Sequence, residues 1–142
     1  MERNRDMVKE LAERALENLD RAYVPYSHFH VSAALLAEDG RIFTGVNVEN
    51  ASYPAGICAE RTAFVKAVSE GAKEFSAIAI CGGEDRHVTD YCPPCGICRQ
   101  VMREFCDPED FRIFLVKTPE DYREYRLSEL LPESFGPEHL KV

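Results

Sequence analysis

Three cysteines and one glutamate have the residue types and the spacing of a catalytic metal site. Cys58 and Glu60 stand two positions apart, and Cys95 and Cys98 form a Cys-x-x-Cys pair further along the chain. Zinc prefers four sulfur or nitrogen ligands in a tetrahedron, and a catalytic site keeps the fourth position for water. We therefore predict one Zn²⁺ per chain, held by the three thiolates with a water or hydroxide as its fourth ligand. Glu60 would move protons beside it.

A fourth cysteine, Cys92, competes with this assignment because it forms a second Cys-x-x-Cys pair with Cys95. We prefer Cys95 with Cys98, since residues i and i+3 share one face of a helical turn. Cys92 precedes two prolines, which hold the chain extended and away from that turn. Two alternatives remain open. One is a closed structural zinc module that adds Cys92 to the other three thiols and leaves Glu60 without a role; the other is a redox switch that uses the same thiols without metal.

Hydrophobic periodicity places both halves of the site at the start of a helix. Residues 58–71 carry apolar side chains at helical spacing and end at Gly71, a typical left-handed stop. The pair of Cys95 and Cys98 opens a second helical pattern. Thiolates are favoured there, because unpaired amides and the helix dipole lower the thiol pKa. Cys58 and Glu60 can meet only where the chain enters its helix, with Cys58 at or before the cap.

The remaining patterns indicate a mixed sheet with helices on its faces. A helix between consecutive strands implies a parallel crossover, whereas two extended segments joined by the Asp39-Gly40 turn form an antiparallel hairpin. One domain, residues 1–142, accommodates all of these elements. In chain order we expect a helix at 8–19, strands at 29–37 and 41–46, a helix at 58–71, a strand at 75–81, a helix at 97–105 and a strand at 111–116.

The composition favours a small neutral ligand over a polyanion. The 142 residues include 25 acidic and 17 basic side chains, a net charge of −8, and the basic residues are scattered singly. Phosphate recognition needs clustered basic groups, so nucleic acid is not an expected partner. No apolar run approaches the roughly 20 residues that span a bilayer, and the first six residues lack an apolar signal core. We expect a soluble, cytoplasmic protein without membrane contact, in which Cys81 and Cys106 pack as small buried hydrophobes.

Several short motifs share their order and spacing with one family. They are Pro25-Tyr26-Ser27-His28-Phe29, Asn47-Val48-Glu49-Asn50, Cys58-Ala59-Glu60-Arg61-Thr62-Ala63, Pro94-Cys95-Gly96-Ile97-Cys98-Arg99-Gln100 and Leu130-Leu131-Pro132-Glu133-Ser134-Phe135. Through these motifs the chain resembles the small homotetrameric cytidine deaminases over almost its whole length. The resemblance implies zinc-dependent hydrolytic deamination of cytidine and deoxycytidine to uridine and deoxyuridine, in pyrimidine salvage. It also implies a three-layer α/β/α sandwich with a mixed sheet of about five strands.

The same resemblance assigns roles around a nucleoside. Asn47 and Glu49 would bind the ribose hydroxyls, and a bare carboxylate there would repel phosphate. Phe29 would line the nucleoside pocket, and Phe135 would come from a neighbouring subunit to stack on the base, so that the homotetramer shares its active sites. Core packing is the alternative role for Phe29 and Phe135, and packing on the protein surface is the alternative for Tyr53. The expected substrate-binding residues are Phe29, Asn47, Glu49, Tyr53, Ala59 and Phe135.

Three thiolates and one Zn²⁺ leave a net negative charge, which weakens the ability of the metal to acidify water. Arg61 and Gln100, which follow the two cysteine motifs, are candidates to donate hydrogen bonds that offset this charge. For Arg61 the alternative is a solvent-exposed position on the helix.

The nearest enzymatic alternative is a deaminase of another aminopyrimidine nucleoside, such as blasticidin S, which shares the zinc motifs. That class is not expected to keep the pair Asn47-x-Glu49 together with Phe135. The cysteine at the first ligand position also argues against the editing and deoxycytidylate branches, which typically use His-x-Glu. Two positions depart from the family pattern: Ser32 stands in place of a glycine, and Cys92 in place of the commoner serine before the Pro-Cys pair.

Overall fold

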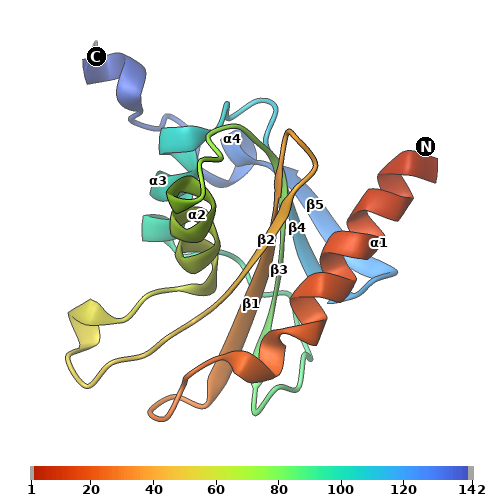
Figure 1. The fold of residues 1–142 in the computed structure, drawn as a ribbon, viewed down its shortest axis with the longest axis vertical. Helices are drawn as coiled ribbons and strands as arrows, with labels where there is room; N and C mark the ends of the chain where they lie inside the picture. Colours follow the sequence, from red (N-terminus) through yellow and green to blue (C-terminus); the bar gives the residue numbers. More distant parts are fainter. Residues whose placement is uncertain (1, 141–142) are drawn as a thin grey trace.

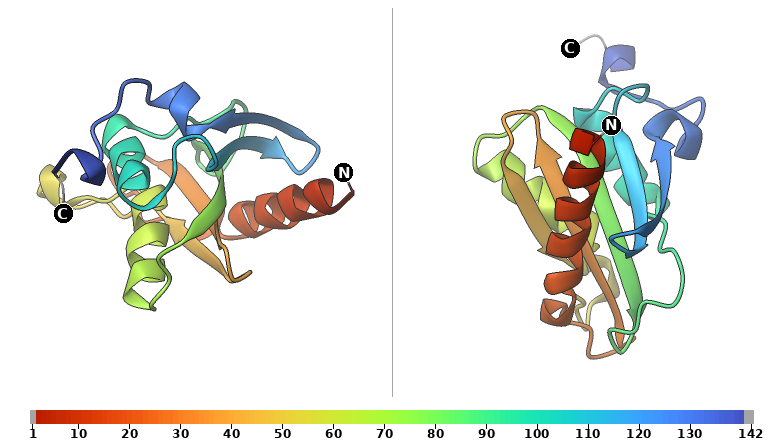
Figure 2. Two further views of the ribbon diagram at one scale, coloured as in Figure 1. Left: turned by 90° about the horizontal axis from the view of Figure 1, so that it is seen from above. Right: turned by 90° about the vertical axis from the view of Figure 1, so that its right-hand side faces the viewer.

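Five strands form one mixed sheet, with helices packed on both of its faces (Figures 1 and 2). The computed structural model describes residues 2–140. The strands are β1 (Phe29–Ala37), β2 (Ile42–Val46), β3 (Phe75–Glu84), β4 (Arg112–Thr118) and β5 (Asp121–Arg126). The α-helices are α1 (Glu2–Glu17), α2 (Ala59–Ser69), α3 (Gly96–Phe105) and α4 (Leu127–Leu130), and the 3-10 helices are η1 (Leu19–Arg21), η2 (Tyr53–Ala55) and η3 (Pro137–Leu140).

The strands lie in the order β2-β1-β3-β4-β5. β1 is antiparallel to both β2 and β3, β3 is parallel to β4, and β4 is antiparallel to β5. α2 joins β2 to β3, and α3 joins β3 to β4, so each helix connects two strands that run in the same direction. The predicted mixed sheet and three-layer sandwich are confirmed, with α1 on one face and α2 with α3 on the other (Figure 1).

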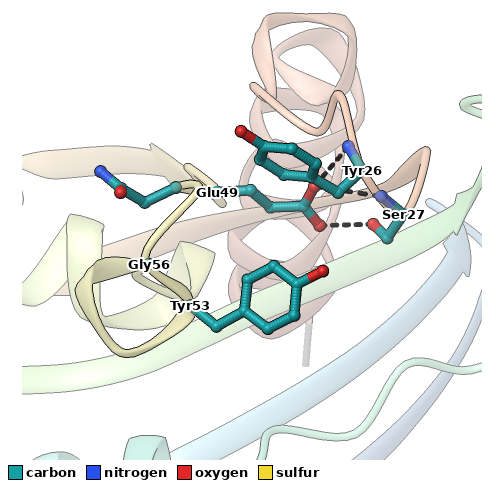
Figure 3. A pocket seen from close by; sticks show the side chains of 6 residues that line it. Tyr26, Ser27, Glu49, Tyr53 and Gly56 are labelled. Atoms are coloured by element: carbon teal, nitrogen blue, oxygen red, sulfur yellow. Dashed lines mark hydrogen bonds between the residues drawn. The ribbon is translucent and has the colours of Figure 1, made fainter.

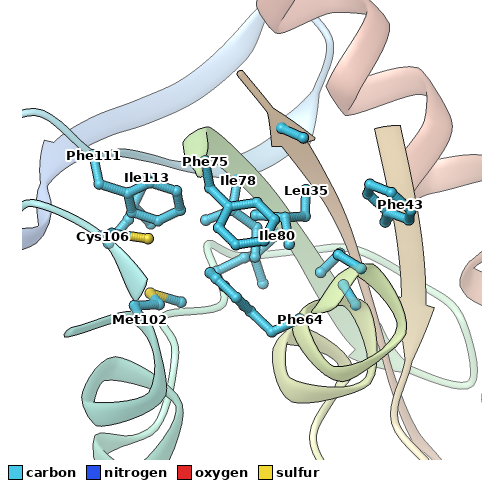
Figure 4. Close-up of a cluster of buried hydrophobic side chains, with 14 of the residues drawn as sticks. Leu35, Phe43, Phe64, Phe75, Ile78, Ile80, Met102, Cys106, Phe111 and Ile113 are labelled. Atoms are coloured by element: carbon cyan, nitrogen blue, oxygen red, sulfur yellow. The ribbon is translucent and has the colours of Figure 1, made fainter. Parts of the chain in front are cut away.

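Alternation of side chains along β3 divides the core into two clusters. Ala79 and Cys81 belong to the cluster beneath α1, where small residues let the helix approach the sheet closely. Ile78 and Ile80 point to the opposite face and pack with Phe64 of α2 (Figure 4). This second cluster anchors the two helices that begin with the candidate metal ligands.

Element boundaries differ from the expected ones where polar or small residues continue an element. α1 begins at Glu2 instead of near residue 8, and β3 continues to Glu84, beyond the predicted end at residue 81. The sequence patterns do not locate β5, because only Tyr122 and Tyr125 in this strand are half-buried and the other side chains are exposed. β5 is an edge strand, and a strand with one polar, solvated side gives a weak apolar signal.

Two cysteines outside the metal motifs are core residues. Cys81 and Cys106 are buried, as predicted, and burial raises the pKa of both thiols. Ser32 is fully buried as well, and its hydroxyl oxygen has no hydrogen-bond partner among residues 2–140. In the described part of the chain, no helix has both the length and the apolar composition that membrane crossing requires.

Candidate active site

The two halves of the metal site come from the first turns of α2 and α3. Cys58 is the N-cap of α2 and Cys95 is the N-cap of α3, both with extended backbone. The Sγ of Cys95 accepts a hydrogen bond from the amide of Cys98 at 3.5 Å, so this thiol caps its own helix. Glu60 lies in the first turn of α2, which is the arrangement that its spacing from Cys58 requires.

The Sγ atoms of Cys58, Cys95 and Cys98 lie within 4.8 Å of one another. The sulfurs of Cys58 and Cys95 are 3.7 Å apart, and those of Cys95 and Cys98 are 3.4 Å apart. Tetrahedral zinc with Zn–S bonds of about 2.3 Å holds its sulfurs roughly 3.8 Å apart, so the three thiols fit one zinc ion. Within residues 2–140 no other group of His, Cys, Asp and Glu side chains meets this ligand spacing.

Hydrogen bonds at the cluster favour the thiolate form of Cys58. The neighbouring Cys98 thiol interacts with the Cys58 sulfur, and Nη2 of Arg61 donates to this sulfur at 3.4 Å. These contacts lower the pKa of Cys58 to about 5, with the Cys98 interaction as the largest cause. The same interaction raises the pKa of Cys98. Because the thiolate is the form that binds metal, Arg61 is placed to stabilise a ligand and to reduce its charge donation.

Glu60 is buried beside the thiol cluster, with 3% of its surface exposed. Its Oε1 atom has no hydrogen-bond partner among the described residues. Burial, assisted by the negative charge of Cys58, raises the pKa of Glu60 to about 7. A carboxyl group with this pKa can both accept and return a proton near neutral pH. Because a buried carboxyl oxygen without a partner destabilises the fold, its presence indicates a role in binding or chemistry.

Cys92 lies close to the cluster but outside the group of three thiols. It is half-buried over Gly82, where an added Cβ would lie 2.9 Å from the Cys92 sulfur. Burial raises the pKa of Cys92 to about 12, and the negative charges of Glu60 and Cys58 act in the same direction. The environment therefore keeps Cys92 as a neutral thiol, in contrast to the environment of Cys58.

Asn47 fastens the segment after β2 to the first residues of β1. Its Oδ1 accepts a hydrogen bond from the Val31 amide at 2.9 Å, and its Nδ2 donates to the Phe29 carbonyl at 2.9 Å. One N–H of the amide group and one lone pair of its oxygen remain for another partner. Asn47 therefore holds Phe29 in place and keeps the capacity to bind a hydroxyl group.

Glu49 is held by the loop that precedes β1. Its Oε1 accepts hydrogen bonds from the amides of Tyr26 and Ser27, both at 3.1 Å, and its Oε2 accepts from the Ser27 hydroxyl at 2.5 Å. The Ser27 hydroxyl is the largest cause of the lowered pKa of Glu49. Neither Tyr26 nor Ser27 is among the predicted site residues, and their only sequence signal is the motif that ends at Phe29.

Beside this carboxylate is a cavity of about 400 Å³ (Figure 3). Its lining includes neither Cys58 nor Glu60, although it lies where the segment that leads into α2 passes the loop before β1. The rings of Tyr26 and Tyr53 approach edge to face across it, with centroids 6.2 Å apart. The lining residues are Tyr26, Ser27, Glu49, Asn50, Tyr53 and Gly56.

The match to known families agrees with this geometry. Residues 5–112 match the family model described as the cytidine and deoxycytidylate deaminase zinc-binding region. The chain belongs to this deaminase family. A cytidine deaminase from Halalkalibacterium halodurans is 48% identical over 130 residues, which cover 92% of this chain and 95% of that protein.

Two further relatives show that the similarity to deaminases extends over most of the chain. A probable cytidine deaminase from Dictyostelium discoideum is 44% identical over 138 residues, which cover 96% of this chain and 89% of that protein. The crystal structure of a cytidine deaminase from Burkholderia pseudomallei aligns with a TM-score of 0.80 at 43% identity, covering 89% of this chain and 97% of that one.

In this deaminase, the aromatic residues expected near the nucleoside are exposed. The exposed fractions are 42% for Phe29, 77% for Tyr53 and 57% for Phe135. Core packing of the two phenylalanines, the alternative considered above, is therefore wrong. Ala59 is fully buried in the first turn of α2. Their exposure leaves these three rings accessible to a ligand or to another chain.

Side chains of α3 hold the C-terminal segment of the deaminase. Nε2 of Gln100 donates to the Phe135 carbonyl at 2.8 Å, and among the described residues its side chain forms no hydrogen bond with a thiol. Nε of Arg103 donates to the Ser134 hydroxyl at 2.8 Å, and the guanidinium also pairs with Glu138. The role of Arg103 has no sequence signal, since an arginine in the last turn of a helix is ordinarily solvated.

Proposed function

We propose that this protein is a zinc-dependent cytidine deaminase, which hydrolyses the 4-amino group of cytidine and deoxycytidine to give uridine or deoxyuridine and ammonia. The observation that carries the proposal is the convergence of three thiols at helix starts beside the buried carboxyl of Glu60, whose Oε1 has no partner among the described residues. Family membership supports the same reaction, because relatives that match nearly the whole chain are cytidine deaminases.

Cys58, Cys95 and Cys98 would hold the zinc ion. When bound there, zinc supplies Lewis acidity that lowers the pKa of a water molecule toward neutrality. The negative charge of the three thiolates opposes this acidity. Arg61 donates to the Cys58 sulfur and so offsets part of that charge. Cys92 remains a neutral thiol in this scheme, and the protein contributes three ligands instead of the four of a structural module.

Glu60 moves both protons of the reaction. Its carboxylate accepts a proton from the attacking water and delivers it to ring N3 of the base, which makes C4 electrophilic toward the oxygen. Glu60 then carries the second proton of that water to the exocyclic amine, so that the C4–N bond breaks with release of ammonia and C4 becomes a carbonyl. A pKa of about 7 suits a group that alternates between base and acid, a role that contributes about 10²- to 10⁴-fold in rate.

A neutral nucleoside suits the cavity better than deoxycytidylate does. The six lining residues include one carboxylate, Glu49, and no lysine or arginine. A phosphate group placed there would meet a negative charge without a compensating cation. Glu49 and Asn47 retain hydrogen-bonding capacity for the ribose hydroxyls, and the net charge of −8 also disfavours an anionic substrate.

Assembly into a homotetramer with shared active sites is part of this proposal. Phe135 does not line the cavity of its own chain and is held on α3 with its ring exposed, which suits use by a neighbouring subunit. Dilution should then lower specific activity as sedimentation shows smaller species. We also place the reaction in pyrimidine salvage, because it converts free cytidine and deoxycytidine to uridine and deoxyuridine. We propose the cytoplasm as its location.

One experiment tests the reaction and the cofactor together. Purified protein is incubated with cytidine, loss of absorbance is followed as uridine forms, and zinc is measured in the same sample by atomic emission. We expect about one zinc per chain, turnover of cytidine and deoxycytidine, and at least about 100-fold lower kcat/KM for deoxycytidylate. Zinc at that level without turnover of cytidine or blasticidin S would support a structural module. Turnover of blasticidin S alone would support the other deaminase class.

A further inference from the structure

The hydroxyl group of Ser27 joins the two residues expected to contact the sugar. It donates to Oε2 of Glu49 at 2.5 Å and accepts from the amide of Phe29 at 3.0 Å (Figure 3 shows the contact with Glu49). The direction of these bonds is fixed, because an ionised carboxylate only accepts and an amide only donates. One side chain therefore links the orientation of Glu49 to the first residue of β1.

The backbone of this loop is held in a conformation that residues other than glycine rarely adopt. His28 has a φ of 60°, in the left-handed region. Its amide donates to the Val24 carbonyl at 3.0 Å, and its carbonyl accepts from the Asp85 amide at 2.8 Å. Because the strained residue is fixed at both ends, its neighbours Ser27 and Phe29 have little freedom to change their positions.

The hydrogen bonds of Glu49 leave one defined acceptor position. Two backbone amides bind Oε1, and the Ser27 hydroxyl binds Oε2. A carboxylate has about four lone-pair sites, so Oε2 retains one acceptor site. Without the hydroxyl, only the two amide bonds to Oε1 would oppose rotation about the terminal carbon–carbon bond, which moves both oxygens, so Oε2 would be less firmly oriented.

We infer that Ser27 is a positioning residue for nucleoside binding: its hydroxyl fixes the Glu49 carboxylate so that Oε2 accepts a hydrogen bond from a ribose hydroxyl. The inference rests on the proposed function, since it uses the nucleoside as substrate. Ser27 has no part in proton transfer, because the cavity that it lines does not include Cys58 or Glu60. Its contribution is therefore to ground-state binding and appears in KM, not in kcat.

The experiment compares Ser27→Ala, Ser27→Thr and Glu49→Gln on three substrates. These are cytidine, deoxycytidine and 2′,3′-dideoxycytidine, of which the last lacks both ribose hydroxyls. For Ser27→Ala we expect KM for cytidine to rise about tenfold, which corresponds to the loss of one charge-assisted hydrogen bond. The kcat should stay within about twofold of that of the natural protein. For 2′,3′-dideoxycytidine the change in KM should be less than about twofold, because the bond that Ser27 orients is already missing.

Matched variants separate positioning from simple loss of structure. Ser27→Thr retains the hydroxyl and should restore KM for cytidine, whereas Ser69→Ala, an exposed serine at the end of α2, should match the natural protein throughout. Zinc content should not change in any variant. A KM increase that is the same for cytidine and 2′,3′-dideoxycytidine would overturn the inference, as would an unchanged KM for both.

A binding measurement keeps this inference distinct from the proposed reaction. Calorimetric titration with uridine reports the ribose contact without turnover, and Ser27→Ala should weaken this binding by about tenfold, as it raises KM for cytidine. If the natural protein binds uridine and Ser27→Ala weakens that binding while cytidine is not converted, the reaction is wrong and the role of Ser27 stands. If cytidine is converted and uridine binding is unaffected by Ser27→Ala, the proposed reaction stands and the role of Ser27 is wrong.

Discussion

Gly45 of β2 lies against the backbone of Ala63 in α2, so closely that a Cβ atom on Gly45 would be 2.4 Å from the Ala63 amide nitrogen. The same Cβ atom would lie 2.6 Å from the Ala59 carbonyl oxygen, in the first turn of the helix. Only a residue without a side chain permits this approach. Because Cys58 caps α2 and Glu60 lies in its first turn, the contact sets the distance of both groups from the sheet.

Gly45→Ala should therefore displace the start of α2. Backbone atoms cannot move aside as a flexible side chain does, and we expect a loss of about 1–3 kcal/mol in the free energy of unfolding, together with a lower zinc content. Denaturant unfolding and metal analysis measure the two effects. Gly96→Ala is the control for stability, since an added Cβ atom would have no heavy atom within 4 Å apart from its chain neighbours and the nearby backbone of α3. If Gly45→Ala and Gly96→Ala had equal free energies of unfolding, α2 would accommodate the added methyl group by shifting without a loss of stability.

Two cysteine substitutions distinguish a three-ligand site from a four-ligand site. Cys58→Ser should lose zinc and turnover, because Cys58 belongs to the group of three thiols and a serine hydroxyl is a poor zinc ligand. Cys92→Ser should keep both, since its thiol lies outside that group and remains protonated. Zinc analysis and cytidine turnover are measured on the same samples. Loss of zinc from Cys92→Ser would make Cys92 a ligand and the site a closed one.

The fold was predictable wherever an element carries a regular apolar pattern in its sequence. The apolar stripe that includes Leu11 in α1 and the apolar run around Ile78 in β3 are patterns of this kind, although α1 begins earlier and β3 ends later than the sequence indicates. β5 could not be predicted, because its six residues present charged and tyrosine side chains to both surfaces of a sheet edge. Its pairing with β4 depends on backbone hydrogen bonds, which leave no apolar pattern.

The metal cluster could be anticipated because its ligands are defined by chemistry and by short spacings. Cys95 and Cys98 share a helical turn, and Cys58 needs only to cap a second helix nearby. Ser27 could not be anticipated in the same way. Its hydroxyl reaches Glu49 across 22 positions of sequence through a loop whose path depends on the left-handed conformation of His28. Nothing in a serine of a turn motif specifies such a partner.

Glu60→Gln should remove proton transfer while leaving the metal site intact. The amide is nearly the same size as the carboxyl, so the buried position beside the cluster remains filled, but it cannot accept and return protons at neutral pH. We expect turnover to fall by about 10⁴-fold or more, since one group serves both steps, with about one zinc per chain retained. Stopped-flow absorbance with a parallel metal assay checks this. Turnover within about tenfold of the natural protein would assign the proton transfers to another group.

The contact between Arg103 and the C-terminal segment yields the last prediction. Arg103 is 8% exposed and pairs with Glu138 and Ser134, and Gly136 lies directly on the guanidinium, where an added Cβ would be 2.2 Å from Nη1. Arg103→Ala removes these contacts at once. We expect a loss of about 1–3 kcal/mol in the free energy of unfolding and faster hydrogen exchange in residues 134–140.

An exposed arginine on another helix provides the matched control for Arg103→Ala. Arg14 pairs with Glu10 across one turn of α1, with 44% of the arginine side chain and 61% of the glutamate side chain exposed, and Arg14→Ala should cost no more than about 0.5 kcal/mol. If Phe135 serves a neighbouring subunit, Arg103→Ala should also raise KM for cytidine, since the segment that carries the ring is then held on α3 by fewer contacts. If Arg103→Ala matches Arg14→Ala in its free energy of unfolding and in hydrogen exchange, Gln100 alone holds the C-terminal segment. The bond from Gln100 to the Phe135 carbonyl is unchanged in both variants.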